Sequence, residues 1–420
     1  MNKTVYIINC PPSWIKTPPL SLVYLKNYLK NKGVNIKIID LNILFFKLFN
    51  YNKIEWLKLN KNFEQNLFNL VEEKYPFIFE NLYKRIEKIE FIGFSLFKRN
   101  FSFSLNLANR VKEKFPEKNI IFGGPEILFL KLENKINCLQ KYLWVLGEGE
   151  IPLFKIINEK PDNYEFEEIE NLDSLPFFDF EDLNLKLYSQ SLPIISSRGC
   201  PYQCNFCSER KLYKKFRYHS PEYVVEQIKY LKNKYLLNNF IFCDSLINFK
   251  INWLEQLCKL LIKNKLNIKW EAQMRIEKEL PLELAKLIKK SGCYNLFVGL
   301  ESASNRVLKM MNKGFDTDIA LNFFKILKKA KLQFEISLIF GYPFEEEKDF
   351  NETLNFIIKN KKLIPKIAQA NPFIDYLKNF KNENSFTTKG KERVGFFLKV
   401  LQRENIRYTK SFINNLIYEN

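Results

Sequence analysis

The stretch SSRGCPYQCNFCSER at residues 196–210 sets three of the chain's eight cysteines in one short, turn-rich segment with the spacing C-x3-C-x2-C. Three is an odd number for a disulfide framework, and a chain of 420 residues can bury a core without such bridges. A structural zinc site favours four ligands in two pairs, and no second cysteine pair occurs in the sequence. Three thiolates suit a four-iron cluster that keeps one iron open for another ligand. We therefore expect an iron–sulfur cluster at Cys200, Cys204 and Cys207.

This cysteine segment follows the first of six apolar runs that alternate with helical text. The expected strands cover 192–197, 239–244, 268–274, 295–302, 334–341 and 366–373. After the cysteines, Ser220 and Pro221 mark the N-cap and the first position of a helix. Six strand–helix units in one series predict an α/β fold, a partial (β/α)6 TIM-type barrel over 192–373, with its chemistry at the carboxyl ends of the strands. The cysteine segment lies at that end.

The first 160 residues show another alternating series. Strands are expected at 4–10, 34–42, 89–95, 119–124 and 142–150, which predicts a doubly wound, Rossmann-like parallel sheet over 1–160. Two helices are expected within 43–88, and the acidic segment 161–191 is predicted to be a linker. Ligands of such sheets bind at the carboxyl ends of the strands, where small residues let a large ligand approach the backbone. The candidates at this rim are Ser95, Gly123, Gly124, Gly147, Glu148 and Gly149.

The composition does not by itself name a partner. A net charge of +19 invites a nucleic acid, but the lysines are scattered and often alternate with acids on helical faces. The joint abundance of Lys, Asn, Ile and Phe is the bias of an AT-rich genome, so we expect a solvated basic surface and no nucleic acid. No run of about 18 apolar residues and no signal-peptide pattern occurs, so we expect no membrane span. We expect a reducing cytoplasm, where thiols stay available to metal.

At these residues the chain resembles the radical S-adenosylmethionine enzymes. The cysteine segment, with an aromatic residue just before the third cysteine, matches the family's signature. The runs GLES at 299–302, GYPFE at 341–345 and WEAQMR at 270–275 resemble further motifs of the family's barrel. The resemblance implies that the three thiolates hold a [4Fe-4S] cluster whose fourth iron is chelated by the amino and carboxylate groups of S-adenosyl-L-methionine. It also implies contacts to that cosubstrate from Phe206, Arg275, Glu301, Ser302 and Gly341.

One motif departs from the family pattern. The Gly-Gly-Glu run often found after the second barrel strand is replaced by Cys243, Asp244 and Ser245. This departure leaves open which groups hold the methionyl amine. Arg198 is expected either to pair with the cosubstrate carboxylate or tune the cluster, or to form a structural ion pair, and the sequence does not separate these roles. No catalytic residue can be named from these motifs.

The first half resembles the cobalamin-binding domain of some of these enzymes. The resemblance rests on the prolines at 11–12, PPLSLVYLKNYL, GFS, GGPE, GEGE and the linker LDSLPFFDF. It makes the six rim candidates cobalamin contacts. No D-x-H-x-x-G motif occurs, and the one histidine, His219, follows the cysteine segment, so cobalamin is expected without an imidazole ligand from this domain. The alternative is a domain that kept the fold and lost the cofactor. His219 is expected to be a capping or surface residue.

The activity implied by this resemblance is radical chemistry. A reduced cluster would split S-adenosylmethionine into methionine and a 5′-deoxyadenosyl radical, which takes hydrogen from an organic substrate; cobalamin-dependent methyl transfer is the leading outcome. The alternatives are a cobalamin-free radical enzyme for cyclisation, rearrangement or RNA modification, and a non-catalytic iron–sulfur protein. A tRNA methylthiotransferase would carry a second cysteine triad, but only Cys10 and Cys138 precede residue 200. The implied partners are a small-molecule or natural-product substrate and an electron donor such as flavodoxin or ferredoxin.

The other cysteines have simpler expected roles. Cys258 shares a helical face with leucines and is expected in the core. Core or surface positions are expected for Cys138 and Cys293. Cys243 ends the second barrel strand and could face the pocket, but no direct role is expected for it. The C-terminal segment 374–420 is rich in Lys and Asn and carries no motif.

Overall fold

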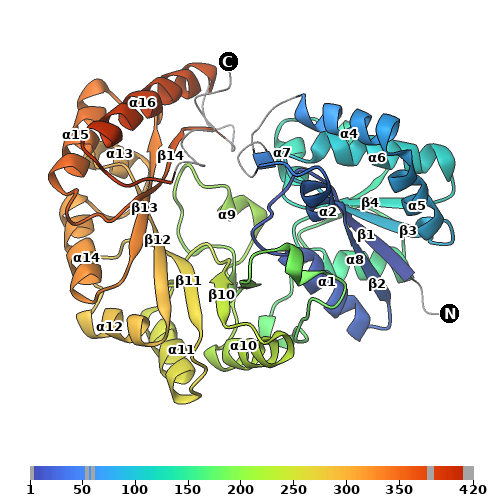
Figure 1. Ribbon diagram of the computed structural model, residues 1–420, viewed down its shortest axis with the longest axis horizontal. Helices are drawn as coiled ribbons and strands as arrows, with labels where there is room; N and C mark the ends of the chain where they lie inside the picture. Colours follow the sequence, from blue (N-terminus) through green and yellow to red (C-terminus); the bar gives the residue numbers. More distant parts are fainter. Residues whose placement is uncertain (1–3, 53–55, 58–61, 376–382, 410–420) are drawn as a thin grey trace. The chain divides into compact units, whose positions relative to one another are not determined.

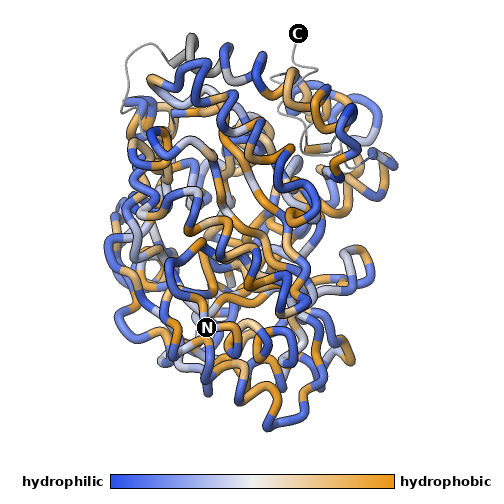
Figure 2. The backbone as a smooth tube through the Cα atoms, turned by 90° about the vertical axis from the view of Figure 1, so that its left-hand side faces the viewer, coloured by the Kyte–Doolittle hydropathy of each residue, from blue (hydrophilic) through white to orange (hydrophobic). Residues whose placement is uncertain are grey.

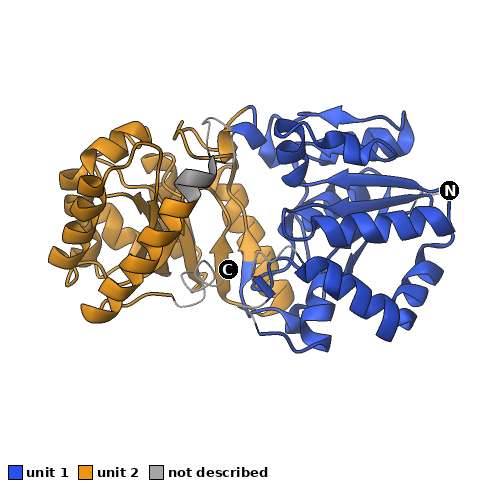
Figure 3. Cartoon of the chain, turned by 90° about the horizontal axis from the view of Figure 1, so that it is seen from above, with its two compact units in different colours: residues 1–192, 211–214 blue, residues 193–210, 215–420 orange. Residues whose placement is uncertain are grey.

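The computed structural model describes residues 4–52, 56–57, 62–375 and 383–409. The chain divides into two compact units, which are coloured separately in Figure 3. Unit 1 comprises residues 1–192 with 211–214, and unit 2 comprises residues 193–210 with 215–420. Each unit is built around its own six-stranded sheet.

Unit 1 contains a parallel sheet with the strand order β2-β1-β3-β4-β5-β6. Its strands are β1 (Thr4–Asn9), β2 (Asn35–Asp40), β3 (Phe91–Ser95), β4 (Asn119–Gly123), β5 (Leu143–Leu146) and β6 (Tyr164–Glu165). The chain order reverses between β1 and β3, which is the switch point where ligands of doubly wound sheets bind. The predicted doubly wound sheet is therefore confirmed. Every residue of β3 is buried, as expected for a central strand of a parallel sheet.

Two groups of helices accompany this sheet. Helix α1 (Leu20–Asn31) packs on β2 and on α8 (Glu150–Asn158), whereas α4 (Phe63–Lys74) packs on α5 (Pro76–Ile86) and α6 (Phe101–Lys114) (Figure 1). The described residues of unit 1 also form α2 (Leu41–Leu48) and α7 (Glu126–Leu132). Two helices were predicted within 43–88; α4 and α5 lie in this range, and α2, which begins at Leu41, overlaps it. Residues 53–55 and 58–61 fall outside the described residues. Aromatic residues of this segment contribute to a core; their buried rings include Phe45, Trp56, Phe68 and Phe79, and Phe103 of α6 contacts three of them.

The acidic segment 161–191 does more than link the units. Its strand β6 extends the sheet, and two short 3-10 helices follow at Leu172–Ser174 and Leu185–Leu187. Buried Lys26 on α1 forms ion pairs with Asp182 at 3.3 Å and Asp179 at 3.9 Å. Asp179 and Asp182, two of the acidic residues on which the linker prediction rested, are thus partners of a buried lysine.

Unit 2 contains an open barrel with strands in chain order, β14-β13-β12-β11-β10-β7. The strands are β7 (Leu192–Ile194), β10 (Asn239–Phe242), β11 (Lys269–Met274), β12 (Cys293–Glu301), β13 (Phe334–Phe340) and β14 (Ile367–Pro372). The pairs from β10 to β14 are parallel. β7 and β14 are the outer strands, so the barrel is partial, as predicted.

Helices follow the barrel strands in turn. They are α10 (Pro221–Tyr235), α11 (Ile251–Lys263), α12 (Leu282–Lys290), α13 (Asn305–Met310), α14 (Thr317–Lys329) and α15 (Glu347–Lys359). Ser220 caps α10 as predicted, because its side chain accepts a hydrogen bond from the amide of Tyr223 at 3.2 Å. Figure 2 shows hydrophobic and hydrophilic stretches alternating along the helices, as expected for helices with one buried face.

Two elements of unit 2 were not predicted. A short antiparallel ribbon of β8 (Ser197–Arg198) and β9 (Arg217–Tyr218) joins the two ends of the segment that carries the cysteines. A C-terminal helix, α16 (Glu383–Arg403), packs on β13 and β14. A Cβ atom at Gly390 would lie 2.6 Å from the carbonyl oxygen of Phe340, so glycine permits this close contact of helix and strand.

Candidate cluster and cofactor site

The three predicted cluster cysteines lie in the loop between β8 and α9 (Glu209–Leu212). Gly199 starts this loop in a left-handed conformation, with φ of +81°. Cys204 is buried, and Cys200 and Cys207 are half-buried. Among the described residues, no three His, Cys, Asp or Glu side chains converge as they do around a single metal ion. A four-iron cluster does not require such convergence, because each thiolate binds a different iron atom.

Burial is the main influence on the acidity of the Cys200 and Cys207 thiols. It raises the pKa of Cys207 to about 11 and also raises the pKa of Cys200. The neighbouring thiols add to the increase, because like charges disfavour a second thiolate. Metal ligands must be deprotonated, so the binding of iron at this loop has to release protons.

Polar contacts fix the loop against the end of α13. The amide of Asn205 donates to the carbonyl oxygen of Met311 at 3.0 Å, and its side chain donates to that of Met310 at 2.8 Å. Asn312 donates in return to the carbonyl oxygen of Gln203 at 2.8 Å. Phe206 packs against a small buried cluster, whose members are Val307, Met311, Tyr342 and Phe373. One side of the loop is therefore anchored before any ligand binds.

Arg275, at the end of β11, reaches the cysteine loop. Its Nη1 donates a hydrogen bond to Sγ of Cys204 at 3.4 Å, and its guanidinium lies 3.9 Å from the centre of the Tyr202 ring. The Tyr202 hydroxyl donates to Glu277 at 2.6 Å, and Glu277 lies 3.4 Å from Nε of Arg275. The structure thus brings this predicted cosubstrate contact to the sulfur of a predicted cluster ligand.

Glu301 ends β12 in an unusual backbone conformation. Its φ is +68°, and such a conformation in a non-glycine residue persists only where surrounding contacts enforce it. The carboxylate accepts a hydrogen bond from Ser337 at 3.0 Å and pairs with buried Lys313 at 3.4 Å. A Cβ at Gly299 would lie 2.4 Å from a Glu301 oxygen. Glu301 is therefore held at the strand end, where the resemblance implies a cosubstrate contact.

Ser302, the next predicted contact, is engaged inside the protein. Its side chain is buried, lies 3.3 Å from the Thr353 hydroxyl and accepts a hydrogen bond from the amide of Ser304 at 3.1 Å. These contacts shape the loop after β12.

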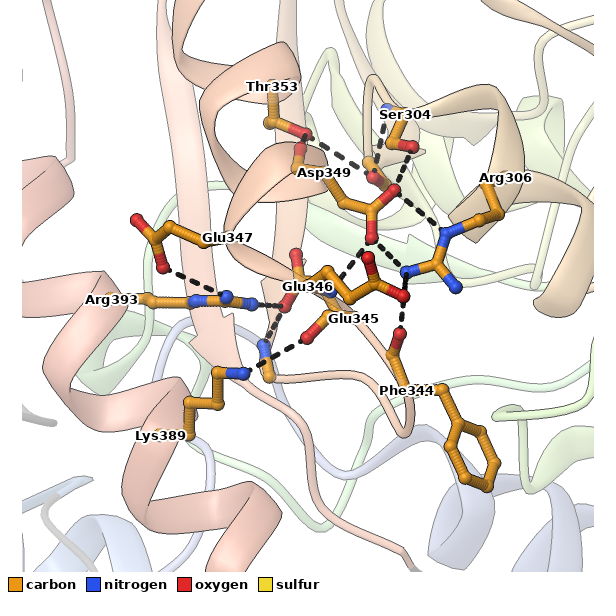
Figure 4. Close-up of polar contacts among 12 residues, drawn as sticks. Ser304, Arg306, Phe344, Glu345, Glu346, Glu347, Asp349, Thr353, Lys389 and Arg393 are labelled. Atoms are coloured by element: carbon orange, nitrogen blue, oxygen red, sulfur yellow. Dashed lines mark hydrogen bonds and ion pairs between the residues drawn. The ribbon is translucent and has the colours of Figure 1, made fainter.

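The turn after β13 carries Gly341 and is shown in Figure 4. Gly341 has φ of +76°, and its amide donates to the carboxylate of Glu345 at 2.5 Å. Arg393 of α16 pairs with the same carboxylate at 2.5 Å, and Lys389 donates to the Glu345 carbonyl oxygen at 3.1 Å. The C-terminal helix therefore holds the turn that the resemblance places at the cosubstrate.

A second network in Figure 4 fixes the start of α15. Asp349 accepts hydrogen bonds from Arg306 and from Ser304, and it forms a capping box with Glu346. Burial opposes the charge on Asp349, but the hydrogen bonds from Arg306 and Ser304 outweigh it and lower the pKa of Asp349 to about 2. This carboxylate is thus a structural anion.

Asp244, in the place of the missing Gly-Gly-Glu run, is also structural. It is buried and accepts hydrogen bonds from the amide and hydroxyl of Ser196, at 2.9 and 2.8 Å, and from the hydroxyl of Ser197 at 2.6 Å. Burial raises the pKa of Asp244 to about 6, and the serine hydrogen bonds partly offset that rise. The carboxylate therefore ties the end of β10 to the segment that leads into the cysteine loop.

Most of the predicted rim residues of unit 1 have structural roles, because they allow close contacts and turns or bind the backbone. A Cβ at Gly124, where φ is +105°, would lie 2.5 Å from the Leu96 carbonyl oxygen, and one at Gly149 would lie 2.9 Å from Leu25. Gly147 has φ of +98° beside Phe166. Glu148 is buried and accepts a hydrogen bond from the amide of Ile169 at 2.9 Å.

Two rim residues remain close to the predicted crevice. Ser95 ends β3 and is buried. Gly123 ends the neighbouring strand β4, and a Cβ there would meet no described atom within 4 Å. Because β3 and β4 are paired and parallel, both residues lie at the same edge of the sheet.

The remaining predictions for single residues meet a mixed outcome. His219 is fully buried and stacks on Tyr223 at 4.1 Å, so of the two expected roles, capping or surface, the surface position is wrong. Cys258 and Cys293 are buried, as expected, and Ser291 donates to Sγ of Cys258 at 3.4 Å. Cys138 and Cys243 are exposed. Arg198 is buried in the ribbon opposite Arg217.

Sequence reasoning missed the residues that support the site. Glu277 and Lys313 belong to no motif, and Tyr202 and Asn205 are not ligand positions of the cysteine motif; the partners of all four lie on other elements. The pattern CPYQCNFC did contain two of them, and an aromatic or amide side chain inside a ligand loop is a usable signal.

A family model matches the part of the chain that contains this cysteine loop. Residues 194–357, which begin in β7 and end in α15, match the model of the radical SAM superfamily. This segment of the chain is similar to the radical SAM superfamily. Among curated proteins it is 30% identical over 247 residues to an uncharacterized methyltransferase of Pyrococcus horikoshii, covering 57% of this chain and 52% of that one. It is 31% identical over 194 residues to the bacteriochlorophyllide d C-12(1)-methyltransferase of Chlorobaculum tepidum, covering 45% and 42%. The chain thus spans about half the length of these relatives.

Solved structures of radical SAM proteins share the whole fold. The cobalamin-dependent S-adenosylmethionine radical enzyme OxsB, solved with aqua-cobalamin and S-adenosylmethionine bound, superposes with a TM-score of 0.67 at 19% identity over 92% of this chain and 56% of that one. The radical S-adenosylmethionine methyltransferase TsrM of Kitasatospora setae gives 0.63 at 13% identity over 85% and 71%. Both matches extend well beyond the barrel, so the likeness in fold covers most of both units. None of the helices in the described ranges has the length and apolar character needed to cross a bilayer.

Proposed function

We propose that the chain is a radical S-adenosylmethionine enzyme whose cluster is held by Cys200, Cys204 and Cys207. The observation that carries this proposal is the cysteine loop itself, which follows the first barrel strand within the matched segment 194–357. The donor set fits the group, because three thiols from one anchored loop leave a fourth iron for the cosubstrate. When bound and reduced, the cluster supplies the electron that breaks a C–S bond of S-adenosylmethionine and so yields a hydrogen-abstracting 5′-deoxyadenosyl radical.

The proposed role of the chain's own residues is to bind and orient the cosubstrate. We assign cosubstrate contacts to Phe206, Glu301 and the backbone at Gly341, because each lies at the carboxyl end of the barrel or on the cysteine loop. Glu301 can accept hydrogen bonds from hydroxyl or ammonium groups, and Lys313 keeps its carboxylate in place. The other two predicted contacts have partners inside the protein: Arg275 donates a hydrogen bond to Cys204, and Ser302 accepts one within the loop after β12.

For the whole protein we propose cobalamin-dependent methyl transfer. The support is that the named relatives include methyltransferases and that the structures similar in fold include a cobalamin-dependent enzyme. Domain boundaries at 1–160, 161–191, 192–373 and 374–420 belong to this proposal, as do a small-molecule or natural-product substrate, a flavodoxin- or ferredoxin-type electron donor and a reducing cytoplasm. The alternative is a cobalamin-free radical enzyme.

Gly123 offers a direct test of cobalamin binding. Leucine at this position projects from the end of β4 into open space and leaves the backbone undisturbed, unlike a side chain at Gly124. We expect wild-type protein to take up cobalamin on anaerobic reconstitution, with a spectrum that shows no protein imidazole on cobalt. Gly123→Leu should lose cobalamin and keep iron and 5′-deoxyadenosine formation.

The control is Gly395→Leu, because a Cβ at Gly395 of α16 also meets nothing within 4 Å and lies on the barrel unit. It should bind cobalamin as the wild type does. Wild-type protein that cleaves S-adenosylmethionine but takes up no cobalamin would leave the cobalamin-free alternative.

A further inference from the structure

The guanidinium of Arg275 and the sulfur of Cys204 are brought together from positions 71 residues apart. Cys204 is the most buried of the three loop thiols, with 7% of its surface exposed, and the Arg275 side chain is 10% exposed. Both groups are therefore largely shielded from water. A charged donor acts more strongly on a sulfur in such surroundings than it would in solvent.

The surrounding contacts hold this guanidinium in one place. Cζ of Arg275 lies 3.9 Å from the centre of the Tyr202 ring. Glu277 contacts both the Tyr202 hydroxyl and Nε of Arg275. The backbone of Arg275 is fixed by Asn248, whose side chain accepts from its amide and donates to its carbonyl oxygen, each at 2.9 Å. A long, flexible side chain has thus been ordered toward a sulfur atom.

We propose that Arg275 is a positioning residue that raises the reduction potential of the cluster through Cys204; this inference rests on the proposed function, which places the cluster at this loop. The added electron makes the cluster more negative, so a fixed cation on a ligand sulfur stabilises the reduced form more than the oxidised form. Hydrogen bonds to ligand sulfurs and nearby charge are among the levers that set such potentials. Glu277 acts in the opposite sense, because its carboxylate partly neutralises the field of the guanidinium.

The test is the midpoint potential of the cluster, followed by electron paramagnetic resonance during redox titration of the reconstituted full chain without S-adenosylmethionine. Arg275→Gln should shift the potential to a more negative value, and Glu277→Gln should shift it to a more positive one. Both variants should keep the iron content of the wild type. The control is Arg403→Gln, which removes the same charge from an exposed side chain at the end of α16 and should leave the potential unchanged.

An unchanged potential in Arg275→Gln at full iron content overturns the proposal. If that variant loses iron, Arg275→Lys and Tyr202→Leu decide, because they weaken the contact without removing the charge; wild-type potentials in both overturn it. A role in binding the cosubstrate predicts a different pattern, namely an unchanged potential with weakened binding of S-adenosylmethionine to the oxidised cluster. Wild-type protein that holds no cluster refutes the proposed function itself, before any variant is compared.

Discussion

Asp244 shows how one buried carboxylate organises the entry to the cysteine loop. It accepts hydrogen bonds from three donor groups of two consecutive serines, so its removal would leave Ser196 and Ser197 to rearrange. Burial is nevertheless the larger influence on its ionisation, and the pKa of Asp244 is about 6. A folded-state pKa above the unfolded value of about 3.9 means that the folded protein binds the proton more tightly.

This pKa predicts a pH dependence of stability. The contribution of Asp244 is present below about pH 4 and is lost as the pH rises through about 6, at a cost of up to about 3 kcal/mol. Asp244→Asn cannot ionise, so its free energy of unfolding should gain on that of the wild type over the same interval. Denaturant unfolding of both proteins between pH 4 and pH 7 measures the difference. A difference that stays constant with pH would contradict the prediction.

At the scale of elements, α16 connects the C-terminal segment to the cosubstrate end of the barrel. Its Arg393 and Lys389 hold the turn at 341–345, and its Gly390 allows the helix to touch β13. A buried ion pair such as Glu345–Arg393 carries a desolvation penalty, so its value here is to specify the position of the turn. No motif in the sequence predicted this contact between α16 and the turn at 341–345.

The two glycines of α16 make a matched pair for testing it. Gly390→Ala places a methyl group 2.6 Å from the Phe340 carbonyl oxygen and should lower the melting temperature. Gly395→Ala meets open space and should raise the stability by up to about 1 kcal/mol, because alanine is the better helix former. Thermal unfolding monitored by circular dichroism measures both. Equal effects of the two substitutions would show that α16 does not lie against β13 as described.

At the scale of the whole molecule, the long strands were predictable because buried parallel strands read as apolar runs. The two-residue strands β6, β8 and β9 were not, since so short a segment has no period and is held only by its neighbours. The cluster loop was readable because its ligand spacing is local. The contact of Arg275 with Cys204 was not, because it forms only when the barrel brings β11 beside the loop. The assignments of Phe206, Glu301 and Gly341 to the cosubstrate stay predictions.

The iron content and 5′-deoxyadenosine formation of the cysteine variants test the central claim most directly. Anaerobically reconstituted wild-type protein should hold about four irons and four sulfides per chain at this site. Cys200→Ala, Cys204→Ala and Cys207→Ala should each lose most of the iron and all formation of 5′-deoxyadenosine, whereas Cys258→Ala, buried against Ser291, should keep both. Full iron retention in all three loop variants would contradict the assignment of the cluster to this loop.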